Sequence, residues 1–405
     1  MIRAFHASNY RSLGDDFSVV FPSAPPQLVT LAGPNAAGKS NALDALRFVA
    51  DALRDGVGPA VRRRGSFASL RRGVDARREV MIAIEAVVDD VWWVWGLRLL
   101  PESTDDEVRG WEWGVALPAA EVAPHGTAAA LVELPDLCSV RRLHLLGTHE
   151  SIRSRFINGF FSASGGELAS VEQSLIRTLY LPRYAETHPS LARLLAMLSG
   201  LSVYSIEPAT LRQRQLRSGA SLMLDHGENW SSVLQRLLPE YRGELVSALS
   251  ALVPDVADVR VDALADDLVV QFEHRSATGE SLWIPANRES DGTLRVAALL
   301  TALLQEPPPS LLAIEEPELA VHVRALETLR EYVLTRARST PVILSTHSPH
   351  LLDMLPLDSL RVVSRSDEGT AVAPLSQRQR TLVRQGVYTL AELAFSQPLE
   401  GEGHA

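Results

Sequence analysis

The chain has 405 residues, 46% of them hydrophobic and 22% charged, ordinary values for a globular protein that exclude intrinsic disorder, collagen-like fibres and low-complexity scaffolds. No apolar run approaches the roughly 18 to 20 residues that span a bilayer, the N-terminus lacks the pattern of a signal peptide, and the single cysteine, Cys138, excludes an intramolecular disulfide and a thiolate zinc cluster. The 39 basic and 49 acidic side chains give a net charge of −10, so any polyanion site must be local, and we expect a cytoplasmic protein with no membrane partner.

The first chemical motif lies between a strand predicted over residues 28–31 and a helix predicted over residues 41–53. The segment Gly33-Pro34-Asn35-Ala36-Ala37-Gly38-Lys39-Ser40 matches the phosphate-loop pattern G-x-x-x-x-G-K-[ST] without deviation. Its glycines let backbone N–H groups turn toward phosphate oxygens, and the helix N-terminus adds partial positive charge. Lys39 is the only lysine in the chain, and a compact ammonium suits a tight anion site better than a guanidinium. We predict that Lys39 reaches the β- and γ-phosphates of a nucleotide and that Ser40 takes one Mg²⁺ position; a glycine-rich surface turn is the alternative.

Arginines cluster in the segment that follows, at Arg62-Arg63-Arg64, Arg71-Arg72 and Arg77-Arg78. This stretch from Arg62 to Arg78 could grip the phosphodiester backbone of double-stranded DNA. The alternative is a solvated surface segment, or one that pairs with the chain's excess acidic residues.

Residues 80–88, 91–100 and 111–117 have strand character and predict a small antiparallel lobe. The lobe's strands carry five tryptophans, Trp92, Trp93, Trp95, Trp111 and Trp113. We expect these side chains to pack the lobe, and stacking on nucleic-acid bases is the alternative.

The stretch from about residue 121 to 252 is predicted to be mostly helical, with candidate helices at 190–198, 230–237 and 245–252. It lacks the sustained heptad repeat of a long coiled coil. Strands follow at 256–261 and 268–272. We therefore divide the chain into an N-terminal lobe (1–120), a mostly helical insertion (121–252) and a C-terminal lobe (253–405).

Two motifs mark the C-terminal lobe, one before a predicted buried strand and one at the end of that strand. The segment Ser290-Asp291-Gly292-Thr293-Leu294-Arg295 leads into the apolar stripe 296–304, so Ser290 is a predicted N-cap and Gly292 leaves backbone amides open to an anion. Ordinary helix capping is the alternative interpretation of this segment. The four apolar residues 311–314 then run into Glu315-Glu316-Pro317-Glu318, which predicts a buried parallel strand that ends in carboxylates.

The two adjacent carboxylates, Glu315 and Glu316, are expected to point to opposite faces of an extended chain. We assign Glu315 to Mg²⁺ and Glu316 to the general base that activates water; an exposed acidic turn is the alternative. Residues 341–345 predict another buried strand, ending at Thr346-His347-Ser348-Pro349. His347 there could hydrogen-bond a γ-phosphate and report its loss, although a lone histidine is more often structural. A short helix and an acidic tail are predicted over residues 390–405.

In their order and spacing these motifs resemble those of ABC-type ATPases, in the branch that contains the SMC, RecF and OLD proteins, and most closely the related bacterial AAA-type ATPases. Asn9-Tyr10-Arg11-Ser12 looks like the opening strand and turn of that branch. The segment from Ser290 to Arg295 matches its variant signature, and Ile314-Glu315-Glu316-Pro317-Glu318 its variant Walker B motif. Membrane transporters usually carry aspartate where Glu315 stands and a glycine-glycine-glutamine signature, which argues against a transporter subunit. The resemblance covers roughly residues 1–60 and 225–355.

The resemblance implies an α/β fold, a P-loop NTPase of the ABC-ATPase head type, with a mixed sheet flanked by helices and an antiparallel β lobe. It implies ATP and Mg²⁺ as cofactors, with Lys39, Glu316 and His347 catalytic and with Ser40 and Glu315 on the metal. It also implies that the nucleotide contacts Arg11, Asn41 and the loop residues 33–40. In this family the signature of one subunit, here Ser290 and Gly292, meets the γ-phosphate held by the other subunit, which implies an ATP-sandwiched homodimer.

The leading hypothesis is an ATP-hydrolysing switch whose dimerisation gates a DNA-related activity, in repair, recombination or anti-phage defence, through an effector such as a nuclease on another chain. The alternative is a slow-turnover ATP-dependent scaffold that regulates a toxin or effector and has no direct DNA role. A stand-alone nuclease is disfavoured, because the roughly 50 residues after Asp353 are too few for the Toprim module of OLD nucleases beside the closing elements of the head.

Overall fold

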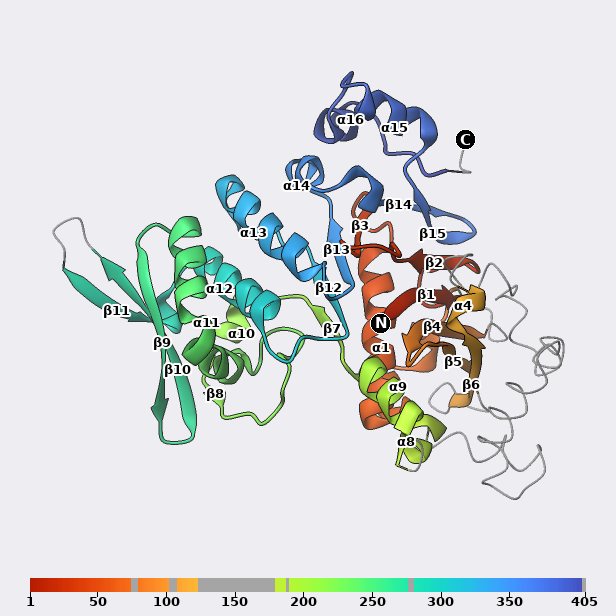
Figure 1. Ribbon diagram of the computed structural model, residues 1–405, viewed down its shortest axis with the longest axis horizontal. Helices are drawn as coiled ribbons and strands as arrows, with labels where there is room; N and C mark the ends of the chain where they lie inside the picture. The colour runs from red at the N-terminus through yellow and green to blue at the C-terminus, as the bar shows by residue number, and fades with distance from the viewer. Residues whose placement is uncertain (74–78, 102–107, 123–178, 187–188, 276–279, 403–405) are drawn as a thin grey trace. The chain divides into compact units, whose positions relative to one another are not determined.

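The computed structural model describes residues 1–73, 79–101, 108–122, 179–186, 189–275 and 280–402, and the chain forms two compact units. The first unit comprises Met1–Ser23, Pro34–Leu201 and Val363–Ala373. The second comprises Ala24–Gly33, Ser202–Val362 and Pro374–Ala405. Each unit is therefore built from segments that lie far apart in the sequence, and Figure 1 shows their elements.

The first unit contains a five-stranded antiparallel sheet in the order β2-β1-β4-β5-β6. Its strands are β1 (Ile2–Ser8), β2 (Phe17–Val20), β4 (Val80–Val88), β5 (Val91–Pro101) and β6 (Val108–Pro118). Short helices α2 (Val57–Arg62), α3 (Phe67–Leu70), α4 (Ala119–Val122) and α8 (Tyr180–Ala185) belong to the same unit. The predicted antiparallel lobe is thus confirmed. The opening strand, β1, ends at Ser8, and the segment 9–12 that was expected to hold strand and turn is a turn with left-handed Asn9 and Arg11, while β2 was not predicted.

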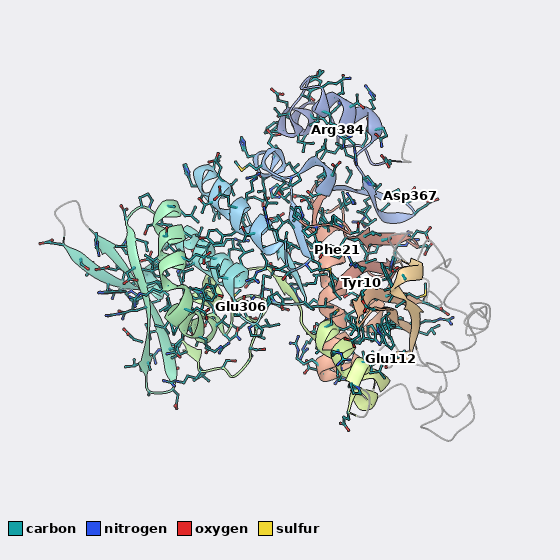
Figure 2. All side chains as sticks on the ribbon, in the orientation of Figure 1. Tyr10, Phe21, Glu112, Glu306, Asp367 and Arg384 are labelled. Carbon is teal, nitrogen blue, oxygen red and sulfur yellow. The ribbon has the colours of Figure 1, made fainter. Side chains whose placement is uncertain are left out.

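The long helix of the first unit is α1 (Lys39–Asp55), which contacts β1 and also α9 (Pro189–Ser199) (Figure 1). Its apolar stripe packs toward the sheet because residues three and four apart share one face of a helix. Phe48 of α1 lies 6.0 Å from the ring of Tyr10, the residue labelled in Figure 2, and the Tyr10 hydroxyl donates a 2.6 Å hydrogen bond to Asp44. Burial and the neighbouring Asp44 carboxylate raise the pKa of Tyr10 well above its usual value.

The second unit contains the parallel strands β3 (Leu28–Ala32), β13 (Val342–Thr346) and β12 (Leu311–Glu315), with β7 (Leu201–Tyr204) beyond β12. On the other side of β3, β14 (Leu360–Ser366) pairs through Leu360–Val362 and continues into the first unit, where it pairs with β15 (Gly369–Pro374). Strands covered on both faces are continuous apolar runs, which is why β3, β12 and β13 could be predicted. All three predicted strands are confirmed.

A second, antiparallel sheet of this unit is formed by β8 (Gln215–Leu216), β9 (Val256–Leu264), β10 (Asp267–Arg275) and β11 (Ser281–Pro285). Helix α11 (Trp230–Leu252) contacts β9 and β10, and α12 (Asp291–Leu304) packs on α11 (Figure 1). Trp230 stacks on Phe272 with ring centroids 6.4 Å apart. The remaining helices are α10 (Pro208–Leu211), α13 (Val323–Arg336), α14 (Pro349–Met354), α15 (Gln377–Arg384) and α16 (Leu390–Ser396).

Two details of the predicted insertion differ from expectation. The two helices predicted at 230–237 and 245–252 are one continuous helix that contains Pro239. Among the described residues up to 252, β7 and β8 are strands inside a stretch predicted to be mostly helical. Residues 123–178, which include Cys138, lie outside the described residues, and so do Arg77 and Arg78.

The tryptophans of β5 are buried, with Trp92, Trp93 and Trp95 exposing 3%, 7% and 1% of their surface. The indole N–H groups of Trp92 and Trp95 each donate a 2.7 Å hydrogen bond, to Glu85 and Glu112. The packing interpretation is therefore confirmed for these three side chains; for Trp111 and Trp113 the structure describes the backbone of β6 only. Within the described ranges, no helix combines the length and the apolarity that a membrane span requires.

Candidate active site

The phosphate loop ends where α1 begins. Gly38 has a φ of 111°, a left-handed value that glycine adopts readily, and it turns the chain into the helix at Lys39. The Lys39 side chain is 6% exposed, and its ammonium donates a 3.0 Å hydrogen bond back to the carbonyl of Pro34. Among the described residues no side chain caps the N-terminus of α1, and its first turn carries no acidic residue. This end of α1 therefore combines an ammonium with helix amides, the groups that bind phosphate.

A hairpin far along the chain supports this loop. Thr370 of β15 places its hydroxyl 2.7 Å from the carbonyl of Ala37 and 2.8 Å from the Ser12 hydroxyl. The Arg365 guanidinium donates to the carbonyl of Ala36 at 3.3 Å. A side chain at Gly38 would have its Cβ 2.2 Å from the Thr370 hydroxyl, so Gly38 is needed for space as well as for its backbone angle. We did not predict Thr370, Arg365 or Ser12 as site residues, and no motif marks the first two.

An open pocket of about 520 Å³ lies beside the loop in the first unit and is lined by Arg11, Ser12, Asn41, Arg64, Ser69, Arg71 and Arg365. Two of these residues, Arg11 and Asn41, are predicted nucleotide contacts. Arg11 has a left-handed φ of 50°, and its guanidinium lies 3.0 Å from Asp44. The Asn41 amide donates a 2.7 Å hydrogen bond to Ser12. Four guanidinium groups with hydroxyl and amide donors make this a pocket for an anion.

The arginine cluster is largely engaged within the first unit. Arg63 pairs with Asp51 at 3.2 Å and with Asp55 at 2.6 Å. Arg64, whose side chain is 5% exposed, bonds Asp44 at 3.0 Å and Asp51 at 2.9 Å. For these two arginines the alternative interpretation, pairing with acidic residues, is confirmed.

The acidic strand end departs from the expected geometry. β12 ends at Glu315, and Glu316 adopts a left-handed φ of 44°, so the backbone is not extended through both carboxylates and the argument from opposite faces was wrong. The Glu316 N–H donates to the carbonyl of Ser345 at 2.9 Å. Its carboxylate lies 2.9 Å from Nδ1 of His347, and an ionised carboxylate can only accept, which places the proton on Nδ1. The predicted general base and the predicted switch histidine are thus hydrogen-bonded to each other.

Glu318 and Thr346 complete this cluster. The Thr346 hydroxyl donates to Glu318 at 2.6 Å and accepts from the Ser348 N–H at 2.9 Å. The second carboxylate oxygen of Glu318 and the Ser345 hydroxyl are buried without a hydrogen-bond partner among the described residues. Both Glu318 and Thr346 stand inside motifs that the sequence marks, but no role was predicted for either. Unpartnered buried oxygens at a strand end are groups that a metal-bound or bridging water can satisfy.

The signature segment, at the start of α12, contacts the turn that carries Glu316. Ser290 caps α12 by accepting from the Thr293 N–H at 3.1 Å, as predicted. A Cβ at Gly292 would lie 2.8 Å from the carbonyl of Ala320, so the glycine lets α12 approach the turn that follows Glu316. Arg295, for which no role was predicted, donates to the carbonyls of Ile206 at 2.9 Å and Glu316 at 3.2 Å.

Strand register within the second unit brings the strand ends to one edge of the sheet. Ala32, the residue before Gly33, pairs with Thr346, and Glu315 pairs with Ser345. The phosphate loop therefore begins at the edge where the Glu316 turn and His347 lie. Ligands of open α/β sheets bind at the carboxyl ends of parallel strands.

The donor types fit Mg²⁺. Magnesium takes one or two carboxylates and hydroxyls and completes its shell with water and phosphate oxygens, rather than requiring an all-protein cage. Within the described residues there is no group of three or more His, Cys, Asp or Glu that could hold a metal alone. Ser40 and Glu315 are donors of the type required.

Comparison with known folds defines the class. The chain resembles the SMC head domain of Pyrococcus furiosus, solved with an extended coiled coil and bound to the C-terminal domain of ScpA, at 15% identity and a TM-score of 0.51 over 95% of this chain and 99% of that one. An SMC head with coiled coil and joint from Pyrococcus yayanosii gives 12% identity and a TM-score of 0.52 over 96% and 99%. An SMC head bound to the C-winged helix domain of ScpA gives 15% and 0.51 over 94% and 99%. The fold is that of an SMC-head P-loop ATPase.

A family match makes the assignment more specific. Residues 28–84 and 220–353 match the family described as "AAA domain, putative AbiEii toxin, Type IV TA system". A search of curated proteins finds no match. The family match and the shared SMC-head fold together support an assignment to the SMC/RecF/OLD-like ATPases of the AAA type.

Proposed function

We propose that this chain is an ATP-hydrolysing switch that dimerises head to head around ATP and Mg²⁺ and gates an effector on another chain. The observation that carries the proposal is the 2.9 Å hydrogen bond between His347 and Glu316, at the sheet edge from which the phosphate loop begins. A carboxylate held by a histidine at the strand edge from which a phosphate-binding loop begins is suited to activating water against a bound nucleotide.

Each residue has a stated role in this proposal. Lys39 and the amides at the start of α1 bind the β- and γ-phosphates, while Arg11 and Asn41 contact the nucleotide from the pocket of the first unit. Glu316 accepts the proton of the attacking water, and His347 orients that carboxylate through Nδ1. Bound Mg²⁺, held by Ser40 and Glu315, would neutralise phosphate charge as it develops.

The primary experiment is Mg²⁺-dependent ATP hydrolysis by the purified chain, with Lys39→Ala as the blank. We expect measurable turnover that this substitution abolishes, because it removes the ammonium at the phosphates. Glu316→Gln should lower turnover by about 10²–10⁴-fold, the usual contribution of a general base, while ATP stays bound. Turnover that is equal in the wild type and in Lys39→Ala would contradict the proposal.

The dimer is tested through the same variant. In saturating ATP and Mg²⁺, Glu316→Gln should raise the dimer fraction measured by light scattering, because unhydrolysed ATP holds the two heads together. The signature residues Ser290 and Gly292 would then meet the γ-phosphate of the other subunit. A monomeric mass under those conditions would contradict dimerisation without affecting the hydrolysis result.

The effector and DNA parts of the proposal have different support. Two similar SMC heads are solved with ScpA bound, which supports a partner on another chain. Adding linear double-stranded DNA to the ATPase assay distinguishes the two function classes. Stimulation of ATP turnover by DNA favours a DNA-related switch that uses the Arg62–Arg78 segment. Turnover indifferent to DNA favours the alternative, a regulator of a toxin or effector, which the family description also supports.

A further inference from the structure

Arg295 is a buried arginine in the second turn of α12 that the proposed mechanism does not use. It is 6% exposed, and two of its guanidinium nitrogens donate to backbone carbonyls, one of Ile206 and one of Glu316. Its third nitrogen, Nε, is buried without a hydrogen-bond partner among the described residues. A cation this deeply buried needs a compensating negative charge.

The compensating charge comes from the acidic motif. Burial lowers the pKa of Arg295, and the carboxylates of Glu316, Glu318 and Glu315 act in the opposite direction. The carboxylates of the acidic motif therefore favour the charged form of Arg295, which is supplied by the signature segment of the same chain.

The backbone that Arg295 holds is strained. A left-handed φ of 44° is uncommon for a residue with a side chain, and such a conformation persists only when its surroundings fix it. Three hydrogen bonds fix this peptide: the Glu316 N–H donates to Ser345, and the Glu316 carbonyl accepts from the Leu319 N–H at 3.1 Å and from Arg295 at 3.2 Å. The Leu319 N–H belongs to the turn itself, whereas Ser345 belongs to the neighbouring strand β13 and Arg295 to helix α12, so Arg295 ties the turn to the signature segment.

The close approach of Gly292 to Ala320 gives a second link between the same two segments. The 2.8 Å separation that a Cβ at Gly292 would have from the Ala320 carbonyl means that α12 and the turn are in direct backbone contact. Ala320 also has a left-handed φ, of 61°. A shift of the α12 N-terminus is therefore transmitted to the turn that carries Glu316.

We propose that Arg295 is a positioning residue for Glu316, through which the signature segment sets the orientation of the general base in its own chain. This inference rests on the proposed ATPase function. Its consequence is that a displacement of α12, for example when a second head docks on the signature, alters the hydrolysis step and leaves nucleotide binding in the first unit unchanged.

The test compares steady-state ATPase kinetics and fluorescent-ATP binding in Arg295→Met with those of the wild type. Methionine keeps an apolar chain of similar length and removes both hydrogen bonds and the charge. We expect kcat to fall by about 10- to 100-fold, the effect of misplacing a catalytic group by a fraction of an ångström to one ångström. The dissociation constant for ATP should change less than about 3-fold, because Lys39 and the loop lie in the other unit.

Arg336→Met is the matched control. Arg336 of α13 is also buried, with a side chain 10% exposed, and it also donates to two backbone carbonyls, those of Leu303 at 2.6 Å and Gln305 at 3.4 Å. It belongs to the same unit, and its described partners, including Glu306 at 3.7 Å, lie outside the motifs. Arg336→Met should lower the melting temperature and leave kcat unchanged.

Arg295→Lys keeps the positive charge but can reach only one of the two carbonyls, so we expect an intermediate kcat. This variant also carries the test if Arg295→Met does not fold. Equal kcat in the wild type and in both Arg295 variants would overturn the inference and leave the ATPase proposal standing. The same conclusion would follow if kcat fell in proportion to the melting temperature in the Arg295 and Arg336 variants alike, because the loss would then reflect stability. Absence of hydrolysis in the wild type would overturn both.

Discussion

The phosphate loop and the acidic turn are supported in different ways. The loop depends on residues remote in sequence, with Ser12 before it and Arg365 and Thr370 more than 300 positions after it. The acidic turn is supported mainly by its own motifs: Thr346 bonds Glu318, His347 bonds Glu316, and Arg295 comes from the signature. The residues that support a site can therefore be recognised from sequence only where they themselves stand in a motif, as they do at the acidic turn but not at the phosphate loop.

The largest effect is expected at Arg64, which joins α1 to the arginine cluster. Arg64→Met removes two ion pairs of a buried guanidinium at once and, among the described residues, leaves Asp44 with the cation of Arg11 alone and Asp51 with that of Arg63 alone. We expect a loss of about 3–5 kcal/mol in the free energy of unfolding, measured by urea denaturation. The neighbouring exposed residue supplies the control, because Arg62→Met should change stability by less than about 0.5 kcal/mol. Equal effects of the two substitutions would mean that Arg64 does not anchor α1.

Gly38→Ala tests the space that Thr370 occupies. The added Cβ would meet the Thr370 and Ser12 hydroxyls in a left-handed conformation, so we expect about 2–4 kcal/mol of destabilisation and loss of ATP binding. Gly73→Ala also places alanine at a left-handed φ, of 72°, but nothing in the described part of the chain lies within 4 Å of its Cβ position, so it should cost only the strain, about 1 kcal/mol. If the two alanine variants lose the same stability, the contact with Thr370 is unimportant.

Thr346→Val tests how the acidic turn, in contrast to the phosphate loop, is supported. It removes the hydrogen bond to Glu318 and the acceptor of the Ser348 N–H. We expect a cost of about 2 kcal/mol, since a bond to a charged group is lost in a buried site, and a lower kcat at unchanged ATP affinity. Thr335→Val, on the exposed surface of α13, is the control and should leave both unchanged. A change in ATP affinity instead of kcat would contradict the separation of roles.

Thr370→Val should have the smallest effect on stability, about 1 kcal/mol, because neutral hydroxyl bonds are lost. In contrast to Thr346→Val, it should weaken ATP binding by a few-fold at unchanged kcat, because the loop backbone at Ala37 loses its support. Isothermal titration with a non-hydrolysable ATP analogue measures this affinity. Thr381→Val, an exposed threonine of α15, serves as the control, and the comparison between the two regions fails if Thr370→Val instead lowers kcat alone.

The parts of the fold that could be predicted are those where burial requires a regular pattern of apolar residues in the sequence. β3, β12 and β13 are continuous apolar runs because both faces are covered, and α1 has an amphipathic stripe. The continuous helix α11 could not be predicted, since Pro239 indicates a break. The helix persists through it because Leu237 and Leu245, on either side of the proline, pack into the same core.

The candidate site shows the same limit. Lys39, Glu316 and His347 stand in motifs, so their chemistry could be predicted from residue type and spacing. The left-handed Glu316 could not, because an extended strand is the default for the residue after an apolar run and only tertiary contacts with Ser345 and Arg295 reverse it. Arg365 and Thr370 lie in an unremarkable hairpin, and nothing local indicates that a loop 330 residues earlier rests on them.

The single lysine has a practical consequence for labelling. Amine-directed reagents that modify lysine have one target side chain in this chain, and that target is the ammonium at the start of α1. In the resting loop this group is 6% exposed and bonded to Pro34, so acylation requires the loop to open. The rate of Lys39 acylation, measured by mass spectrometry, therefore reports the rate of loop opening in the unaltered sequence, without an engineered probe.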